Sequence, residues 1–125
     1  MSFHVERIDH VVLRVRNLDG MVRFYEQALG FKVERTIDRL KLVQMRAGAS
    51  MLDLIEHDRP EGGGNMDHLA FRVEPFDRDA IAARLGPLGA TVGEAVQRYG
   101  AEGTGPSVYF HDPEGNQIEL KGPSS

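Results

Sequence analysis

The chain has 125 residues, no cysteine and a formal net charge of −4, which excludes disulfide scaffolds, thiolate metal sites and cysteine nucleophiles. Its arginines are scattered along the chain, which argues against nucleic acid as a partner, and no apolar run approaches the roughly 20 residues of a membrane span. Because the N-terminal segment also lacks the apolar core of a signal peptide, we expect a cytoplasmic protein.

The first half of the chain predicts a strand, a helix and three further strands. Residues 8–15 (IDHVVLRV) alternate as a strand does. A helical stretch follows, capped by Asn17 or Asp19 and closed at Leu29-Gly30. Its apolar positions recur at spacings of three or four: Leu18, Val22, Tyr25 and Leu29. Three strand-like segments come next: FKVERT at 31–36, LKLVQMR at 40–46 and SMLDLIE at 50–56.

The second half repeats this order after a linker at about residues 57–65 that is rich in proline, glycine and charge. Residues 66–73 (MDHLAFRV) match the first predicted strand, and Asp77 caps a second helical stretch that ends at Gly86-Pro87. Three strand-like segments follow again: ATVGEA at 90–95, SVYFH at 107–111 and NQIELK at 116–121. A strong turn signal, DPEG, joins the last two.

This internal repeat indicates a single domain, residues 1–125, built from two related modules. Repeat one spans about residues 6–58 and repeat two about residues 66–122. Each reads as strand, helix, strand, strand, strand. The predicted fold class is therefore α+β, with two tandem βαβββ modules.

Strand periodicity places four ionisable side chains on equivalent sheet faces. Successive side chains of a strand point to opposite faces, and we expect the apolar row of each half to pack against its helix. His10 and His68 then lie on the other face of the first strands, and Asp53 and Glu119 on that face of the last strands. A hydrogen-bonded or solvated strand residue explains each of them alone. Their recurrence favours a metal site, with Glu56 as a substitute for Asp53.

The chain resembles the vicinal oxygen chelate superfamily, which includes glyoxalases, dioxygenases and bleomycin-resistance proteins, and it is most similar to short glyoxalase-domain proteins. Three segments carry the resemblance: IDHVVLRVRNLDGMVRFYEQALGFKV, MDHLAFRV and SVYFHDPEGNQIEL. It implies a homodimer and a cupped mixed sheet with the helices on its outer face. It also implies that His10, His68 and Glu119 are metal ligands, and Asp53 falls where glyoxalase I has its remaining carboxylate. Fosfomycin-resistance enzymes of the thiol-transferase type have a threonine where this chain has Val12.

Two imidazoles with one or two carboxylates suit a borderline divalent ion, so Zn, Ni, Co, Mn and Fe all stay open. Such an ion acts as a Lewis acid on a chelated substrate, while Glu119 or Asp53 moves a proton as the general base. We therefore predict a glyoxalase-like lyase or isomerase that acts on a small α-oxygenated carbonyl compound. Four further residues are weaker candidates for substrate contact: Arg14, Arg72, Arg98 and Tyr109.

Two other functions stay open on the sequence. Without Asp53, the residues His10, His68 and Glu119 form the 2-His-1-carboxylate set of Fe(II) oxygenases, which predicts a ring-cleaving dioxygenase. A metal-free small-molecule binding protein of the bleomycin-resistance kind is the third hypothesis, and the presence of the ligand set argues against it.

Overall fold

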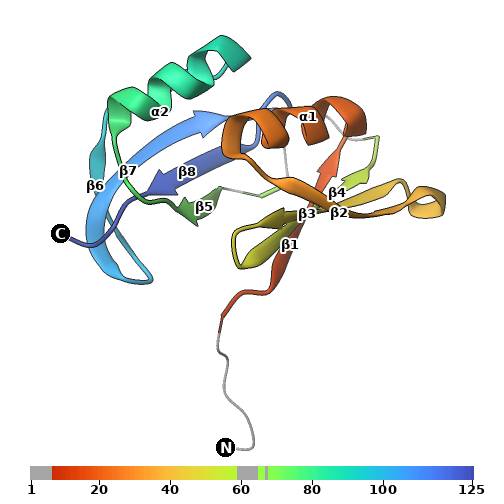
Figure 1. Cartoon of the computed structure of the whole chain (residues 1–125), viewed down its shortest axis with the longest axis horizontal. Coiled ribbons are helices and arrows are strands. Elements are labelled where there is room, and N and C mark those ends of the chain that lie inside the picture. The colour runs from red at the N-terminus through yellow and green to blue at the C-terminus, as the bar shows by residue number, and fades with distance from the viewer. Residues whose placement is uncertain (1–6, 59–64, 67) are drawn as a thin grey trace, which may run out of the picture. The chain divides into compact units, whose positions relative to one another are not determined.

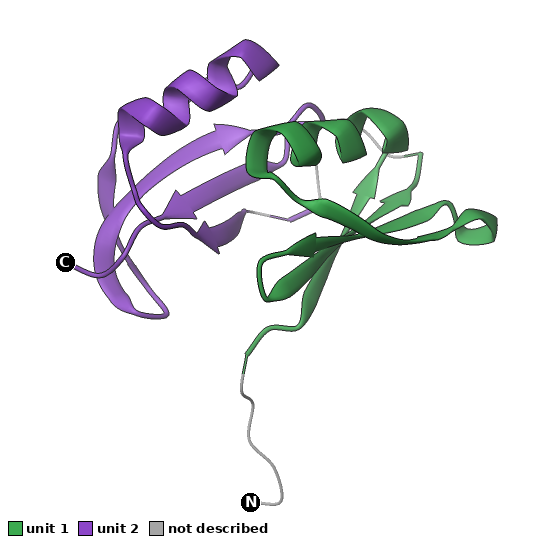
Figure 2. Ribbon diagram, viewed as in Figure 1, with its two compact units in different colours: residues 1–59 green, residues 60–125 purple. Residues whose placement is uncertain are grey.

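The computed structural model describes residues 7–58, 65–66 and 68–125. The chain divides into two compact units, residues 1–59 and 60–125, which Figure 2 shows in different colours. The boundary falls within the linker predicted from the sequence, most of which lies outside the described residues. The grouping of both units into one domain stays a prediction.

Unit 1, residues 1–59, is a four-stranded mixed sheet with one helix (Figure 1). Its elements in chain order are β1 (His10–Val15), α1 (Leu18–Leu29), β2 (Lys32–Ile37), the 3-10 helix η1 (Asp38–Leu40), β3 (Leu42–Ala47) and β4 (Ser50–Glu56). The strands lie in the order β1-β4-β3-β2, with β1 parallel to β4 and the other neighbours antiparallel. The first and last strands of the unit are therefore adjacent.

Helix α1 has the ends that the sequence predicts. The side chain of Asn17 accepts a hydrogen bond from the backbone N–H of Gly20 at 3.0 Å, which satisfies one of the free donors of the first turn. Gly30 follows the last turn with φ of 71°, a left-handed conformation that glycine adopts without steric cost.

The fully buried face of α1 shares only Tyr25 with the recurring apolar positions noted in the sequence. The helix buries four residues: Met21, Phe24, Tyr25 and Ala28. The other three predicted residues, Leu18, Val22 and Leu29, are half-buried. The apolar residues of α1 form two overlapping rows with helical spacing. The aromatic contacts of Phe24 and Tyr25 belong to the row that is buried. The ring of Tyr25 stacks on Phe31 with centroids 5.6 Å apart, and Phe24 meets Tyr25 edge to face.

Unit 2, residues 60–125, repeats the arrangement of unit 1. Its elements are β5 (Leu69–Arg72), α2 (Arg78–Leu85), the 3-10 helix η2 (Gly86–Leu88), β6 (Val96–Gly100), β7 (Gly103–His111) and β8 (Gln117–Lys121). The strand order is β5-β8-β7-β6, with β5 parallel to β8 and β7 antiparallel to both of its neighbours. The two βαβββ units confirm the predicted α+β fold class.

The two faces of each sheet differ as strand periodicity predicts. In β1, Leu13 and Val15 are buried, whereas His10, Val12 and Arg14 on the other face are exposed. Four other strands, β3, β4, β7 and β8, also bury apolar side chains at alternate positions: Val43, Met45, Leu52 and Leu54 in unit 1, and Val108, Phe110, Ile118 and Leu120 in unit 2. Among the described residues, no helix is long and apolar enough to cross a membrane.

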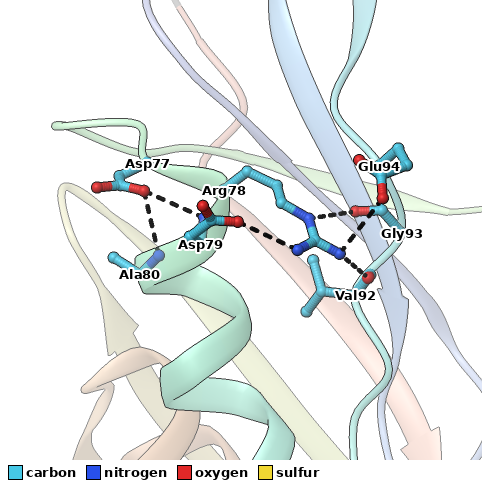
Figure 3. A network of polar contacts seen from close by, with 7 residues as sticks. All are labelled: Asp77, Arg78, Asp79, Ala80, Val92, Gly93 and Glu94. Atoms are coloured by element: carbon cyan, nitrogen blue, oxygen red, sulfur yellow. Dashed lines mark hydrogen bonds and ion pairs between the residues drawn. The ribbon is translucent and has the colours of Figure 1, made fainter.

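The strand expected at residues 90–95 is wrong, because unit 2 forms its next strand only at β6. In its place, Arg78 at the start of α2 donates hydrogen bonds to two carbonyl oxygens of the 90–95 segment, Val92 at 2.9 Å and Gly93 at 3.1 Å (Figure 3). These carbonyls therefore have a side-chain partner instead of a neighbouring strand. The sequence pattern of the segment carries no sign of this distant donor.

Replacing Arg78 with methionine is expected to lower the free energy of unfolding by about 1 to 3 kcal/mol, because the two carbonyls lose hydrogen bonds from a charged donor. The side chain is 31% exposed, so most of its contact area is shielded from water. The measurement is urea denaturation followed by circular dichroism. Arg84→Met, at an exposed position of the same helix, is the matched control, and equal midpoints for the two variants would contradict the expectation.

Candidate metal centre

In unit 1, β1 and β4 bring His10 and Asp53 onto the same sheet face. The parallel register pairs His10 with Met51 and Val12 with Asp53, so the imidazole and the carboxylate lie two positions apart along adjacent strands. Asp53 is buried, with 4% of its surface exposed. This burial excludes the interpretation of Asp53 as a solvated strand residue.

The carboxylate of Asp53 is only half satisfied by the described residues. Gln44, opposite it on β3, donates a hydrogen bond to Oδ2 at 3.1 Å. Oδ1 is buried and has no hydrogen-bond partner within the part of the chain that the structure describes. A buried carboxylate oxygen without a donor is costly. The atom therefore points to a missing partner, and a cation or a proton on a substrate would satisfy it.

His10 is oriented by its sequence neighbour. Its Nδ1 donates a hydrogen bond to Oδ2 of Asp9 at 2.8 Å. This hydrogen bond raises the pKa of His10 above its usual value, the negative charge of Asp53 adds to the effect, and loss of hydration opposes it. A proton on Nδ1 leaves Nε2 as the acceptor or ligand atom when the ring is neutral, which is the usual way in which a carboxylate orients a metal-binding histidine.

Replacing Asp9 with asparagine is expected to lower the pKa of His10, because the largest cause of its elevation is removed. Asp53→Asn is expected to lower the same pKa by less, because Asp53 acts only through its charge. The pKa is read from an NMR titration of the imidazole Hε1 resonance. His57 serves as the internal control, and an unchanged His10 titration in the Asp9→Asn protein would contradict the assignment.

In unit 2, His68 and Glu119 form the equivalent pair. His68 immediately precedes β5, and Glu119 lies on β8, which is parallel to β5. The imidazole Nε2 and the carboxylate Oε1 are 3.4 Å apart. Ser107 on β7 donates a hydrogen bond to the other oxygen, Oε2, at 2.7 Å. Glu119 is buried, with 5% of its surface exposed, so it too is not a solvated strand residue.

Tyr109 and Arg98, two of the predicted substrate-contact residues, lie beside this pair. The rings of His68 and Tyr109 meet edge to face with centroids 6.0 Å apart. Arg98 Nε donates to the Tyr109 hydroxyl at 3.2 Å, and the guanidinium carbon lies 5.7 Å from the centre of that ring. The arginine and the tyrosine therefore form one polar and aromatic wall next to the imidazole.

A hollow of about 250 Å³ opens at this pair within unit 2. Beside His68 and Glu119 it is lined by four polar side chains: Arg72, Tyr99, Glu102 and Lys121. Lys121 is not among the residues predicted from the sequence, and its position two residues after Glu119 is the signal that could have found it. A larger hollow of about 380 Å³ in unit 1, lined by residues such as Asn17 and Lys41, contains none of the four predicted ligands.

Each unit thus brings together one imidazole and one carboxylate. The described residues contain no group of three or more histidine, aspartate or glutamate side chains that would hold a metal alone. Glu56, the predicted substitute for Asp53, is half exposed at the end of β4 and lies 3.3 Å from Lys41. This ion pair gives the Glu56 carboxylate a positively charged partner, whereas Oδ1 of Asp53 has none within the described ranges.

Comparisons with known proteins agree with these features. A family model described as the Glyoxalase/Bleomycin resistance protein/Dioxygenase superfamily matches residues 7–120. Virulence protein STM3117 of Salmonella typhimurium is 30% identical, and the match covers 93% of this chain and 83% of that protein. Metallothiol transferase FosB of Shouchella clausii is 31% identical, with 93% and 80% covered.

A solved structure gives the same result for the fold. The integron cassette protein HFX_CASS4, from the mobile metagenome of the Halifax Harbour sewage outfall, has a TM-score of 0.80 and 24% sequence identity. The match covers 94% of this chain and 99% of that one. At this identity the similarity shows a shared fold.

Proposed function

We propose a metal-dependent proton-transfer activity for this chain, which belongs to the glyoxalase/bleomycin resistance protein/dioxygenase superfamily. The reaction is that of a glyoxalase-like lyase or isomerase acting on a small α-oxygenated carbonyl compound. One observation carries the proposal: the pair of an imidazole and a buried carboxylate that recurs in both units, His10 with Asp53 and His68 with Glu119.

These residues fit a divalent ion. Two neutral imidazoles and two carboxylates are donors that suit Zn, Ni, Co, Mn or Fe. Two ligand atoms that are each about 2.1 Å from a tetrahedral ion lie about 3.4 Å apart, and His68 Nε2 and Glu119 Oε1 are separated by 3.4 Å. Oδ1 of Asp53, which has no hydrogen-bond partner among the described residues, is a further oxygen that a metal ion would satisfy.

The residues of the chain would orient the metal ligands and move the proton. A bound ion would act as a Lewis acid on a chelated substrate. Asp9 holds the ring of His10, and Ser107 holds one oxygen of Glu119, so both ligands are oriented in advance. Oδ1 of Asp53 has no donor among the described residues, which makes it the better of the two predicted bases for moving a proton.

The four-ligand set takes two residues from each unit, and we expect it to be completed in a homodimer. Mixing His10→Ala and His68→Ala chains tests this arrangement. If one copy supplies His10 and Asp53 and the other supplies His68 and Glu119, the mixed dimer recovers one intact site. If all four ligands come from the same chain, the mixture recovers none. Metal content of the isolated mixed dimer separates the two cases, and light scattering gives its mass.

Thiol transfer is the second candidate, supported by the relative named as a metallothiol transferase. Val12 argues against thiol transfer. Its exposed side chain lies beside Asp53 in the strand register. The fosfomycin-resistance enzymes of the thiol-transferase type, which resemble this chain, carry a threonine at that position. A ring-cleaving dioxygenase needs only three ligands. Oδ1 of Asp53, which has no partner in the part of the chain that the structure describes, favours a set of four. Oxygen uptake with Fe(II) and catechols distinguishes that reaction.

Metal analysis of protein purified without a histidine tag tests the proposal as a whole. We expect about one divalent ion per chain, either after purification or after dialysis against Zn, Ni, Mn or Fe(II). Protein that takes up none of these ions in stoichiometric amount would contradict every metal-dependent function, and it would leave the metal-free binding protein as the surviving hypothesis.

A further inference from the structure

We propose that Lys121 binds an anionic group of the substrate, a carboxylate or a phosphate, in the hollow of unit 2. The proposal rests on the proposed function in taking the occupant of the hollow to be the substrate. It also specifies the chemical class of the substrate, because the α-oxygenated carbonyl compound would then be a small acid.

The position of Lys121 connects it to the candidate metal pair. It lies on β8 two residues after Glu119, on the same sheet face, and both residues line the hollow together with His68. Residues two apart on one strand are separated by about 6.6 Å. An acid of modest length would therefore reach from the Glu119 carboxylate to the Lys121 ammonium.

Lys121 is a buried cation without a partner. Only 7% of its surface is exposed. Its ammonium makes no hydrogen bond or ion pair with any residue that the structure describes, and lysine is almost never buried unless it is paired. The stem of the side chain is buried while Nζ stays accessible, and since Lys121 lines the hollow, a negative group there could pair with the ammonium.

The other charges around the hollow are already matched. Arg72 Nε lies 2.7 Å from Glu102 Oε1, and Arg72 Nη1 lies 3.1 Å from Glu74 Oε2. Glu119 accepts the hydroxyl of Ser107 and lies next to His68. Lys121 is thus the charged group of the hollow that is left to receive a negative ligand.

Two glycines leave room around this lysine. A Cβ atom on Gly100 of β6 would come within 3.0 Å of Cδ and Cε of Lys121, and one on Gly105 of β7 would lie 3.2 Å from Nζ. Larger residues at these positions would push the lysine aside. The two glycines therefore leave space along the side chain of Lys121.

The test measures anion binding by the metal-free protein, so that it does not depend on activity. Inorganic phosphate and acetate are titrated separately, and binding is followed by NMR shifts of backbone amides. We expect saturable binding by the wild type and a loss of at least about tenfold in Lys121→Met, a neutral residue of similar length. The anion with the larger loss identifies carboxylate or phosphate as the recognised group.

Two variants make the result specific. Gly100→Ala keeps the lysine but displaces its end, and it is expected to weaken binding without unfolding unit 2. Lys41→Met removes an exposed lysine of unit 1 and is expected to leave binding unchanged. Equal binding by wild type and Lys121→Met, or no saturable binding by the wild type, would overturn the proposal.

Metal content measured on the same samples separates this inference from the proposed function. Anion binding that depends on Lys121 in a protein that takes up no metal supports the anion site and contradicts the metal-dependent reaction. Metal uptake by a protein that binds neither anion supports the metal site and overturns the role of Lys121.

Discussion

Replacing Glu119 with glutamine is expected to lower metal affinity at least roughly a hundredfold, more than the loss of a residue that only supports a ligand. Glutamine keeps the length of the side chain but carries no negative charge. Ser107 retains an oxygen to which it can donate, so the fold of unit 2 should persist. The measurement is metal content by mass spectrometry after dialysis against a chosen free-ion concentration. Turnover should fall in parallel.

Glu114 supplies the matched control for this experiment. It is another buried glutamate of unit 2, with 5% of its surface exposed, and lies in the turn before β8. Glu114→Gln therefore shows how much the loss of one buried carboxylate changes the folding and metal content of unit 2 when that carboxylate is not a predicted ligand. A folded Glu119→Gln protein that holds as much metal as Glu114→Gln would remove Glu119 from the ligand set.

Replacing Asp53 with asparagine is expected to reduce turnover by about 10² to 10⁴-fold, the usual range for loss of a general base. The assay is run at saturating metal, so that a weaker ligand does not limit occupancy. The metal-free variant should also melt at a higher temperature than the wild type, because a buried charged oxygen without a partner is removed. The melting temperature is read by calorimetry in the presence of a chelator.

Asp38→Asn, at an exposed position in the same unit, is the control for Asp53→Asn. Full turnover by Asp53→Asn would transfer the role of base to Glu119. A lower melting temperature of the metal-free variant would mean that the carboxylate has a stabilising partner outside the described residues.

Strand periodicity carries most of what the sequence predicts correctly about the candidate site. Alternation along a strand follows directly from backbone geometry, so the faces of His10 and Glu119 follow from the residues beside them. The parallel pairing of β1 with β4 and of β5 with β8, which puts these faces together, was not predicted and is seen only in the structure. The burial of Asp53 and Glu119 was not predictable in the same way, because it goes with the interior position of β4 between β1 and β3 and of β8 between β5 and β7.

The errors of the sequence analysis come from contacts between distant residues. The pattern at residues 90–95 suits a strand, and Arg78 at the start of α2 binds its carbonyls instead. The burial of Lys121 was not predicted. Glycines of two other strands, Gly100 and Gly105, lie against its side chain, and no local pattern contains that information.

Because the first and last strands of each unit are adjacent, the proposed metal ligands come together only when the sheet of that unit is complete. In both units the imidazole belongs to the start of the chain segment and the carboxylate to its end, and β1·β4 and β5·β8 are the pairings that bring them together. Such long-range parallel pairing is slow, because the whole intervening loop must close first. In a chain still emerging from the ribosome, the imidazole and carboxylate of a unit would not meet until the last strand of that unit is made. If the proposed site holds a metal, retention of that metal would report that both units have completed their sheets.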